Sequence, residues 1–293
     1  MTRAELRRST GLGLPPRRQF RGRLFAVGCL LASLLPVVVG ALLLGALLRQ
    51  GAQMDEPQAL IQRLAASGAD GLLGSVAGSL WLVSLSIFIA MPLGVGAAVH
   101  LEGPRRTGRS LLALNMASLA AVPSVLYGIV GLELFVRALH LGHSLVAAAM
   151  TLALLVMPIV AVAARAALRA VPDELREAGY ALGATRWQVT RQVVLPAALP
   201  GIFSGVILAI ARAFGEAAPL LLVAGLAVSS SESTTLGDPE HVLPLHVFEL
   251  LARPHEAAQA DAIAGVVVLL GTLMVLSTWA TRLRHRHERR RDG

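Results

Sequence analysis

The 293-residue sequence contains no lysine, so all 26 of its basic side chains are arginine. The phosphate-binding loop of a classical ATPase requires a lysine next to its glycine-rich turn, because the ammonium group contacts the nucleotide phosphates. This absence excludes a classical ATPase site within the chain. The energy for any uphill process must therefore come from a partner protein or from an ion gradient.

Cysteine and charged residues are also scarce. The single cysteine, Cys29, lies in an apolar run, and one cysteine excludes an internal disulfide. Charged residues make up 15% of the chain, hydrophobic residues make up 55%, and mean hydropathy is +0.66. A soluble domain of this size does not have such a composition, so we expect membrane-spanning helices. The sequence shows no internal repeat, which disfavours a secondary transporter built from inverted repeats.

Long apolar runs predict an all-α, polytopic membrane protein with six transmembrane helices. The expected spans cover residues 24–48, 73–99, 111–136, 145–168, 201–226 and 263–283. Each has about 20 residues or more, which is the length that a helix needs to cross a bilayer. The alternative for the first span is a cleavable signal peptide, whose apolar region would be shorter. Residues 1–23 and 284–293 are basic tails.

Arginine placement predicts the orientation. With the N-terminus inside, 21 of the 26 arginines fall on the cytoplasmic side, four fall outside and one lies within a span. Cytoplasmic segments of membrane proteins carry this excess of positive charge. Both termini and residues 171–196 are therefore expected in the cytoplasm, and residues 227–261 in the periplasm. The net charge of +8 follows from this placement, so nucleic acid is not an expected partner.

The polar stretch 171–196 carries the start and stop signals of a helical hairpin. Pro172 suits the first position of a helix, where its missing amide hydrogen costs nothing. Asp173 and Glu174 follow, in the first turn, where the helix dipole favours negative charge. Gly183 stands where a left-handed C-terminal cap is expected.

The second arm of this hairpin is predicted to be a short helix. Thr185 and Gln188 have the spacing of a capping box at its start. Pro196 and Pro200 are expected to end it, because proline removes a backbone donor. The product is a helix, a glycine turn and a second helix.

The hairpin resembles the "EAA" loop of ABC-importer permeases. The matching positions are Glu177, Ala178, Gly179, Gly183, Val193, Leu195 and Pro196. Gly179 replaces the usual alanine and Val193 replaces isoleucine. The resemblance implies that this loop couples the chain to an ATPase. Its expected coupling residues are Glu177, Ala178, Gly179, Gly183, Leu195 and Pro196. An ordinary amphipathic connector and a DNA-binding helix-turn-helix remain as alternatives.

Further stretches resemble the phosphate-importer permease subunit of the PstA type. They are residues 122–131, 212–220, 243–248 and 252–254. Ala217 departs from the family pattern, which usually has threonine at this position. The resemblance covers residues 73–283, which we interpret as one permease transmembrane domain with the type I ABC-importer fold.

The resemblance implies a complex in the cell inner membrane. Its expected members are two copies of an ATP-binding ABC subunit, a second permease of the PstC type and a periplasmic phosphate-binding protein, surrounded by membrane lipid. ATP and Mg would bind the ATPase partner, so this chain is expected to carry no cofactor, metal or catalytic residue. Phosphonate or another oxyanion is the alternative substrate. A proton-coupled secondary carrier or a membrane scaffold is the alternative class.

Two charged residues are predicted to lie in the fifth span. Arg212 follows Pro200 by 12 residues, or about 18 Å of helix, which places it near the bilayer centre. Glu216 is expected one turn further on the same helix face. Charges at this depth normally face an aqueous path or a partner. We expect Arg212 to bind an oxyanion in transit and Glu216 to restrain it; a buried structural pair is the alternative.

Other features have structural interpretations. Glu133 and Arg137 lie four residues apart near a membrane edge and predict an interfacial ion pair rather than a gate. Pro123 and Pro158 lie inside expected spans, where they mark either hinges or static kinks.

Overall fold

The computed structural model describes residues 27–35, 38–42, 45–46, 49, 72–102, 109–224, 242–252 and 256–289. The chain divides into two compact units, Met1–Asp55 and Glu56–Gly293. In the first unit, residues 27–35 and 38–42 are helical, within the expected first span. The predicted basic tail 1–23 and most of the loop 227–261 lie outside the described residues.

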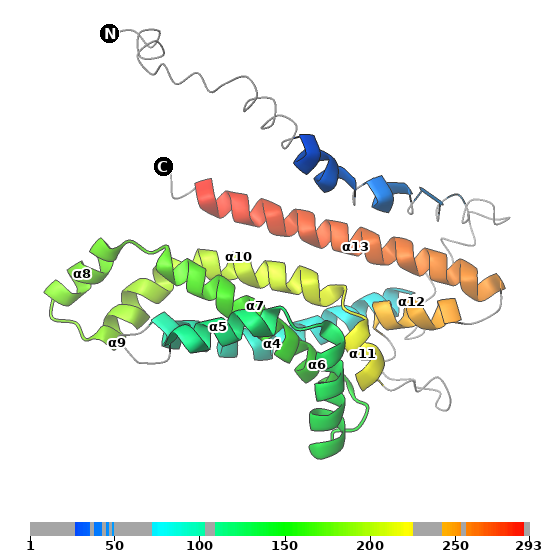
Figure 1. Ribbon diagram of the computed structural model, residues 1–293, viewed down its shortest axis with the longest axis horizontal. Helices are drawn as coiled ribbons and strands as arrows, with labels where there is room; N and C mark the ends of the chain where they lie inside the picture. Colours follow the sequence, from blue (N-terminus) through cyan, green and yellow to red (C-terminus); the bar gives the residue numbers. More distant parts are fainter. Residues whose placement is uncertain are drawn as a thin grey trace, which may run out of the picture. The chain divides into compact units, whose positions relative to one another are not determined.

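The described part of the second unit consists of helices joined by short turns and loops, with no strand among these residues (Figure 1). Its elements are α4 (Leu72–Glu102), α5 (Arg109–Ala120), α6 (Ser124–Gly131), the π-helix η1 (Leu132–Ala138), α7 (Leu145–Arg169), α8 (Asp173–Ala181), α9 (Arg186–Val189), the π-helix η2 (Thr190–Val194), α10 (Leu195–Phe214), α11 (Ala218–Val223), α12 (Leu243–Ala252) and α13 (Glu256–Arg289). Within the described residues, three helices are long and apolar enough to cross a membrane, or four if a bent pair counts as one span. The all-α membrane fold is confirmed, and the count of six spans stays a prediction.

The helix α7 is the core of this unit. In α7, 67% of the apolar stretch is buried inside the protein. The corresponding share is 33% for α4 and 28% for the helical run Arg186–Phe214. Small residues let these neighbours approach α7 closely. A Cβ atom on Gly94 of α4 would lie 2.9 Å from Cγ1 of Val160, and one on Gly205 of α10 would lie 2.3 Å from Cβ of Ala163. Such small residues allow the close van der Waals packing that associates helices in lipid.

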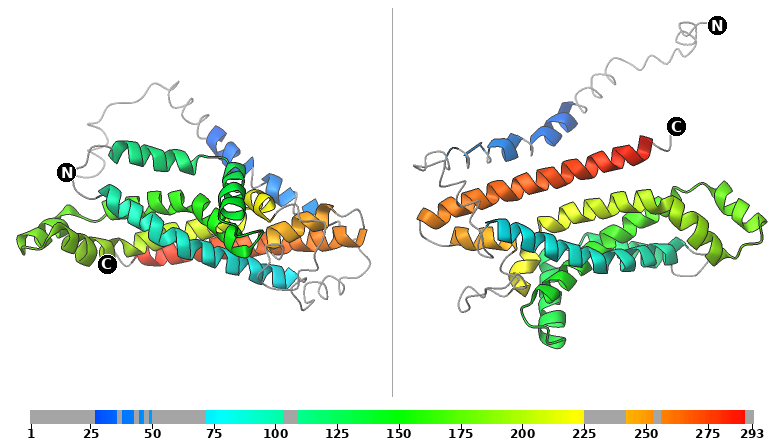
Figure 2. Two further views of the ribbon diagram at one scale, coloured as in Figure 1. Left: turned by 90° about the horizontal axis from the view of Figure 1, so that it is seen from below. Right: turned by 180° about the vertical axis from the view of Figure 1, so that it is seen from behind.

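The expected third span, residues 111–136, is wrong as a single helix. The helices on either side of residues 121–123 meet at an angle of 95°. Pro123, with φ −55° and ψ 134°, precedes the first residue of α6. Proline disfavours a helical conformation in the residue before it, which ends α5 here. As a result α6 and η1 project from the side of the unit (Figure 2).

The expected end of the second hairpin helix at Pro196 and Pro200 is also wrong. The chain remains helical from Arg186 to Phe214. In η2 the Leu195 amide donates to the Thr190 carbonyl, five residues back. This wider turn delivers Pro196 to the first turn of α10, where its missing amide hydrogen is tolerated. The second arm of the hairpin therefore continues directly into a membrane span.

The expected fifth span, residues 201–226, is interrupted. The helix α10 ends at Phe214, residues 215–217 are irregular, and α11 begins at Ala218. Pro219 stands in the first turn of α11. From the sequence, Pro219 is expected to open the helix locally, because it removes the backbone bond to the Gly215 carbonyl. That opening is confirmed, and the prediction of one continuous span is wrong.

Candidate functional site

The first arm of the hairpin is α8, and its end is fixed by Gly183. That residue has φ +79°, in the left-handed region. Its amide donates to the Tyr180 carbonyl at 2.9 Å, and the Ala184 amide donates to the Gly179 carbonyl at 3.2 Å. These two bonds form a Schellman cap, which confirms the prediction for Gly183. Pro172 immediately precedes α8, one position earlier than predicted.

The second arm begins with the predicted capping box. The Thr185 amide donates to Oε1 of Gln188 at 2.7 Å, and the Gln188 amide donates to Oγ1 of Thr185 at 3.4 Å. Val189, which is 1% exposed, packs against the first arm. A Cβ atom on Gly179 would lie 2.9 Å from Cγ2 of Val189. The glycine that replaces the usual alanine of the motif therefore allows the two arms to touch.

Arg176 ties the hairpin to the core. Its Nη2 atom donates to the Leu168 carbonyl at 2.7 Å, in the last turn of α7. Its Nε atom lies 3.4 Å from Oδ1 of Asp173. Sequence reasoning placed this arginine only among the cytoplasmic charges, because a bond to a carbonyl eight residues away has no sequence signature.

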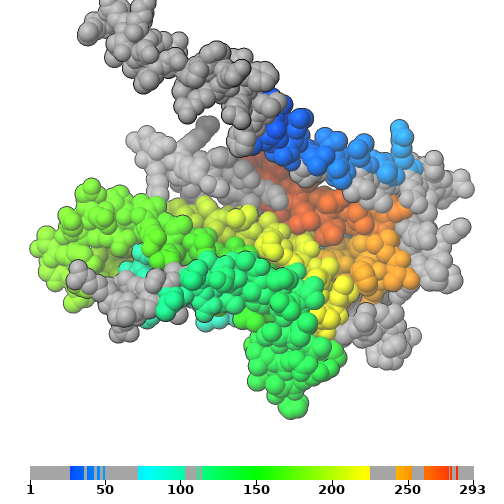
Figure 3. All heavy atoms as spheres, viewed as in Figure 1, coloured from blue at the N-terminus to red at the C-terminus, as the bar shows by residue number. Residues whose placement is uncertain are grey.

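Four large apolar side chains on the hairpin are exposed. Leu175 is 45% exposed, Tyr180 46%, Leu182 89% and Trp187 64%, and we call these four residues the docking face. The hairpin stands at one end of the unit (Figure 3). Gathered exposed apolar side chains mark interaction sites, so the hairpin is a candidate for one.

The six predicted coupling residues do not form one surface. Glu177, Ala178 and Gly183 are exposed on the hairpin, and Gly179 is buried between its arms. Leu195 packs partly against the core, where it begins α10. Pro196 is exposed beside it. The motif therefore combines exposed positions on the hairpin with residues that join the hairpin to a span.

The predicted charge pair forms at the break after α10. Nη2 of Arg212 lies 3.2 Å from Oε1 of Glu216. The Arg212 side chain is 53% exposed, whereas that of Glu216 is 14% exposed. Glu216 does not continue the helix as expected, because α10 ends at Phe214. The pairing is confirmed, and the prediction that both residues share one continuous helix face is wrong.

The short helix α11 is held by contacts that the sequence did not predict. A Cβ atom on Gly128 of α6 would lie 2.8 Å from Cα of Pro219, so the two backbones touch. Nδ1 of His143 lies 2.6 Å from the Val223 carbonyl at the end of α11. This bond spans 80 residues of sequence, so no local pattern could indicate it. The helix α11, which follows the break at residues 215–217, is therefore held in place by α6 and His143.

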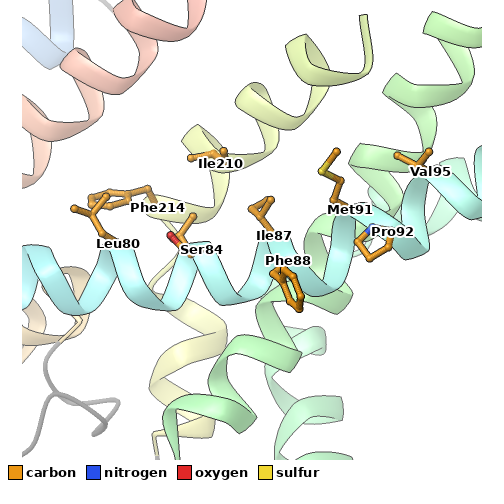
Figure 4. A pocket seen from close by; sticks show the side chains of 10 residues that line it. Leu80, Ser84, Ile87, Phe88, Met91, Pro92, Val95, Ile210 and Phe214 are labelled. Carbon is orange, nitrogen blue, oxygen red and sulfur yellow. The ribbon is translucent and has the colours of Figure 1, made fainter. Parts of the chain in front are cut away.

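A cleft of about 850 Å³ lies between α4 and α10. Ile210 and Phe214 contribute from α10 and face side chains of α4 (Figure 4). Its lining is apolar apart from Ser84 and offers no charged donor. The cleft therefore does not suit a phosphate anion. It does provide space beside Phe214, at the point where α10 ends.

Comparison with known proteins assigns the chain to a family of membrane transport proteins. Residues 90–292 match the family described as "Binding-protein-dependent transport system inner membrane component". The phosphate transport system permease protein PstA 1 of Mycobacterium tuberculosis is 34% identical over 76% of this chain and 73% of its own length. The phosphate transport system permease protein PstC of Mesorhizobium japonicum is 30% identical over 71% of this chain and 70% of its own.

A solved structure shares the fold. A chain from a bacterial ABC transporter involved in the import of the acidic polysaccharide alginate aligns with a TM-score of 0.58 and 16% identity. The alignment covers 92% of this chain and 99% of the other.

Proposed function

Because the chain belongs to the family of binding-protein-dependent transport system inner membrane components, we propose that it is the membrane-spanning permease subunit of an ATP-driven importer of inorganic phosphate. The observation that carries this proposal is the capped hairpin formed by α8 and α9. It exposes four large apolar side chains at one end of the unit and continues without interruption into the span α10.

The hairpin is the element through which ATP hydrolysis reaches this chain. The docking face fits a hydrophobic groove on a separate ATPase, and Glu177 beside it adds a charge for orientation. Two copies of the ATPase serve the complex, one for each permease. ATP and Mg bind to those partners, so this chain performs no hydrolysis and holds no cofactor.

Arg212 and Glu216 form the polar point of the substrate path. The guanidinium of Arg212 presents planar donors that match phosphate oxygens. In the present arrangement its Nη2 atom pairs with Glu216 at 3.2 Å, so an arriving phosphate competes with this carboxylate. Glu216 thereby keeps the site from retaining the anion. Similarity to phosphate permeases from several bacteria supports phosphate as the cargo.

Membership of the family supports the remaining partners. A second permease of the PstC type completes the pore, a periplasmic phosphate-binding protein delivers the anion, and lipid surrounds the six spans. Both termini and the hairpin lie in the cytoplasm. The placement of 21 arginines on that side supports this orientation.

ATPase stimulation in the reconstituted complex tests the substrate. We expect binding protein loaded with phosphate to raise the ATPase rate, because delivery of the correct anion completes the cycle. Binding proteins loaded with a phosphonate or with sulfate are the matched comparisons. Equal or greater stimulation by phosphonate would assign the chain to another oxyanion importer.

A further inference from the structure

A three-residue ion cluster joins the ends of α4 and α7. Oε1 of Glu102, the last residue of α4, accepts from Nε of Arg165 at 2.8 Å and from Nε of Arg169 at 2.7 Å. The side chains of Glu102 and Arg165 are 19% and 22% exposed, whereas that of Arg169 is 59% exposed. One carboxylate oxygen therefore binds two guanidinium groups that come from successive turns of the facing helix.

The cluster lies at matching ends of two packed spans. Both α4 and α7 finish beside it, so the two helices run in the same direction. Further along, Gly94 of α4 lets the helices meet at Val160 of α7, where a Cβ atom would be only 2.9 Å away. The helices therefore touch at a glycine within the span and through charges at its end.

The coupling hairpin begins two residues after the end of α7, close to this cluster. Ala170 and Val171 separate α7 from Pro172 at the start of the hairpin, and Val171 is 2% exposed. Arg176 of α8 returns to bind the Leu168 carbonyl, which precedes Arg169 in the last turn of α7. A displacement of α8 is therefore passed to the same turn of α7 that Glu102 holds.

We propose that Glu102, held by Arg165 and Arg169, is a positioning residue that makes α4 follow α7 when the docked ATPase moves the hairpin. This inference rests on the function proposed above and adds the path from the hairpin to a second span. The chain from α8 through Arg176 to α7, and from α7 through Glu102 to α4, is continuous in hydrogen bonds. Without Glu102, α7 moves with the hairpin while α4 lags.

Transport per ATP hydrolysed tests this role in the reconstituted complex with radiolabelled inorganic phosphate. We expect Glu102→Gln, which keeps size but removes charge, to lower phosphate moved per ATP by about two- to thirtyfold. The basal ATPase rate and the KM for phosphate stay at the wild-type values, because neither the docking face nor the anion path changes. A parallel fall of ATPase and transport, or an unchanged ratio, would overturn the proposal.

Glu133→Gln is the matched control. Glu133 forms an ion pair with Arg137 on η1, as predicted from the sequence, and both side chains are more than half exposed. The same chemical exchange there should leave the ratio of transport to ATPase unchanged. A fall in this variant equal to that of Glu102→Gln would mean that loss of any surface carboxylate uncouples the complex.

A charge swap separates positioning from simple loss of a charge. Glu102→Arg alone places three like charges together and should uncouple most severely. Adding Arg165→Glu again puts one carboxylate between two guanidinium groups, with Arg169 one turn away on α7. We expect the double variant to regain at least half of the wild-type ratio. A double variant no better than Glu102→Arg, in an assembled complex, counts against the cluster.

Pulsed EPR distances test the movement itself and do not depend on the identity of the substrate. Spin labels at Gly96→Cys on α4 and Ala170→Cys after α7, both exposed positions, are placed in a Cys29→Ser background. The label distance should be equal in nucleotide-free and vanadate-trapped wild-type complexes. In Glu102→Gln it should change on trapping. If this distance behaves identically in both proteins, α4 does not depend on Glu102, even where phosphate transport is normal.

Discussion

At the residue scale, the hairpin depends on one backbone conformation. Gly183 has φ +79° with no atom within 4 Å of an added Cβ, so the constraint is on the backbone and not on space. Gly142, in the loop before α7, has φ +63° and is equally open. A residue with a side chain costs about 1 to 2 kcal/mol in this region at either position. Substitution of either glycine therefore causes the same backbone strain, inside the hairpin at Gly183 and outside it at Gly142.

Gly183→Val should abolish phosphate uptake and weaken capture of the ATPase, because the strained cap redirects α9 and disperses the docking face. Capture is measured by co-purification of the ATPase with tagged variants of equal membrane abundance. Gly142→Val, which carries the same backbone cost away from the hairpin, should capture the ATPase as the wild type does. Full uptake by Gly183→Val would show that the hairpin is not the coupling element.

The sequence predicts a residue's role well where its bonds are local. The Gly183 cap and the Thr185–Gln188 capping box involve partners within five residues, and both are confirmed. Arg176 binds a carbonyl eight residues away and Glu102 binds guanidinium groups 63 and 67 residues away. These bonds depend on how whole helices pack, which no local pattern records.

At the element scale, the sequence predicts the apolar runs but, of their breaks, only the opening before Pro219. Hydropathy measures how apolar a segment is, and it has the same value for a straight helix and for the bent pair around Pro123. Pro196 was predicted to end a helix, yet the π-turn before it lets the helix continue. The opening before Pro219 was foreseen because proline removes the bond to the Gly215 carbonyl.

The Arg212–Glu216 pair lies at the break between α10 and α11, and its role in transport can be tested by substitution. Arg212→Ala and Glu216→Ala should each lose uptake in an assembled complex, since one removes the anion's donor and the other removes its restraint. Arg212→Lys should recover little, because a point charge lacks the planar fork. Uptake is measured with labelled phosphate in intact cells.

The charge-swapped variant, Arg212→Glu with Glu216→Arg, decides between an anion path and a structural pair. A structural pair at 3.2 Å should tolerate the exchange and transport phosphate. An anion path should not, because a carboxylate would then occupy the more exposed position. Restored uptake in the swap would remove Arg212 from the substrate path.

At the scale of the whole molecule, the helices α4 and α7 of the described unit run in the same direction. Both end on the side that carries the hairpin, and the chain returns from the hairpin through α10. With the hairpin as the proposed coupling element, ATP is supplied on the side of residues 171–196 and phosphate accumulates on that same side. A proton-coupled carrier, the alternative from the sequence, would need no ATP.

The most direct test is uptake by the complex in proteoliposomes, with residues 171–196 facing a lumen that contains ATP. Phosphate-binding protein and labelled phosphate are added outside. The account predicts that phosphate accumulates inside against its gradient, only with ATP in the lumen, and that dissipating the proton gradient changes nothing. Accumulation without ATP, driven by an imposed proton gradient, would contradict it.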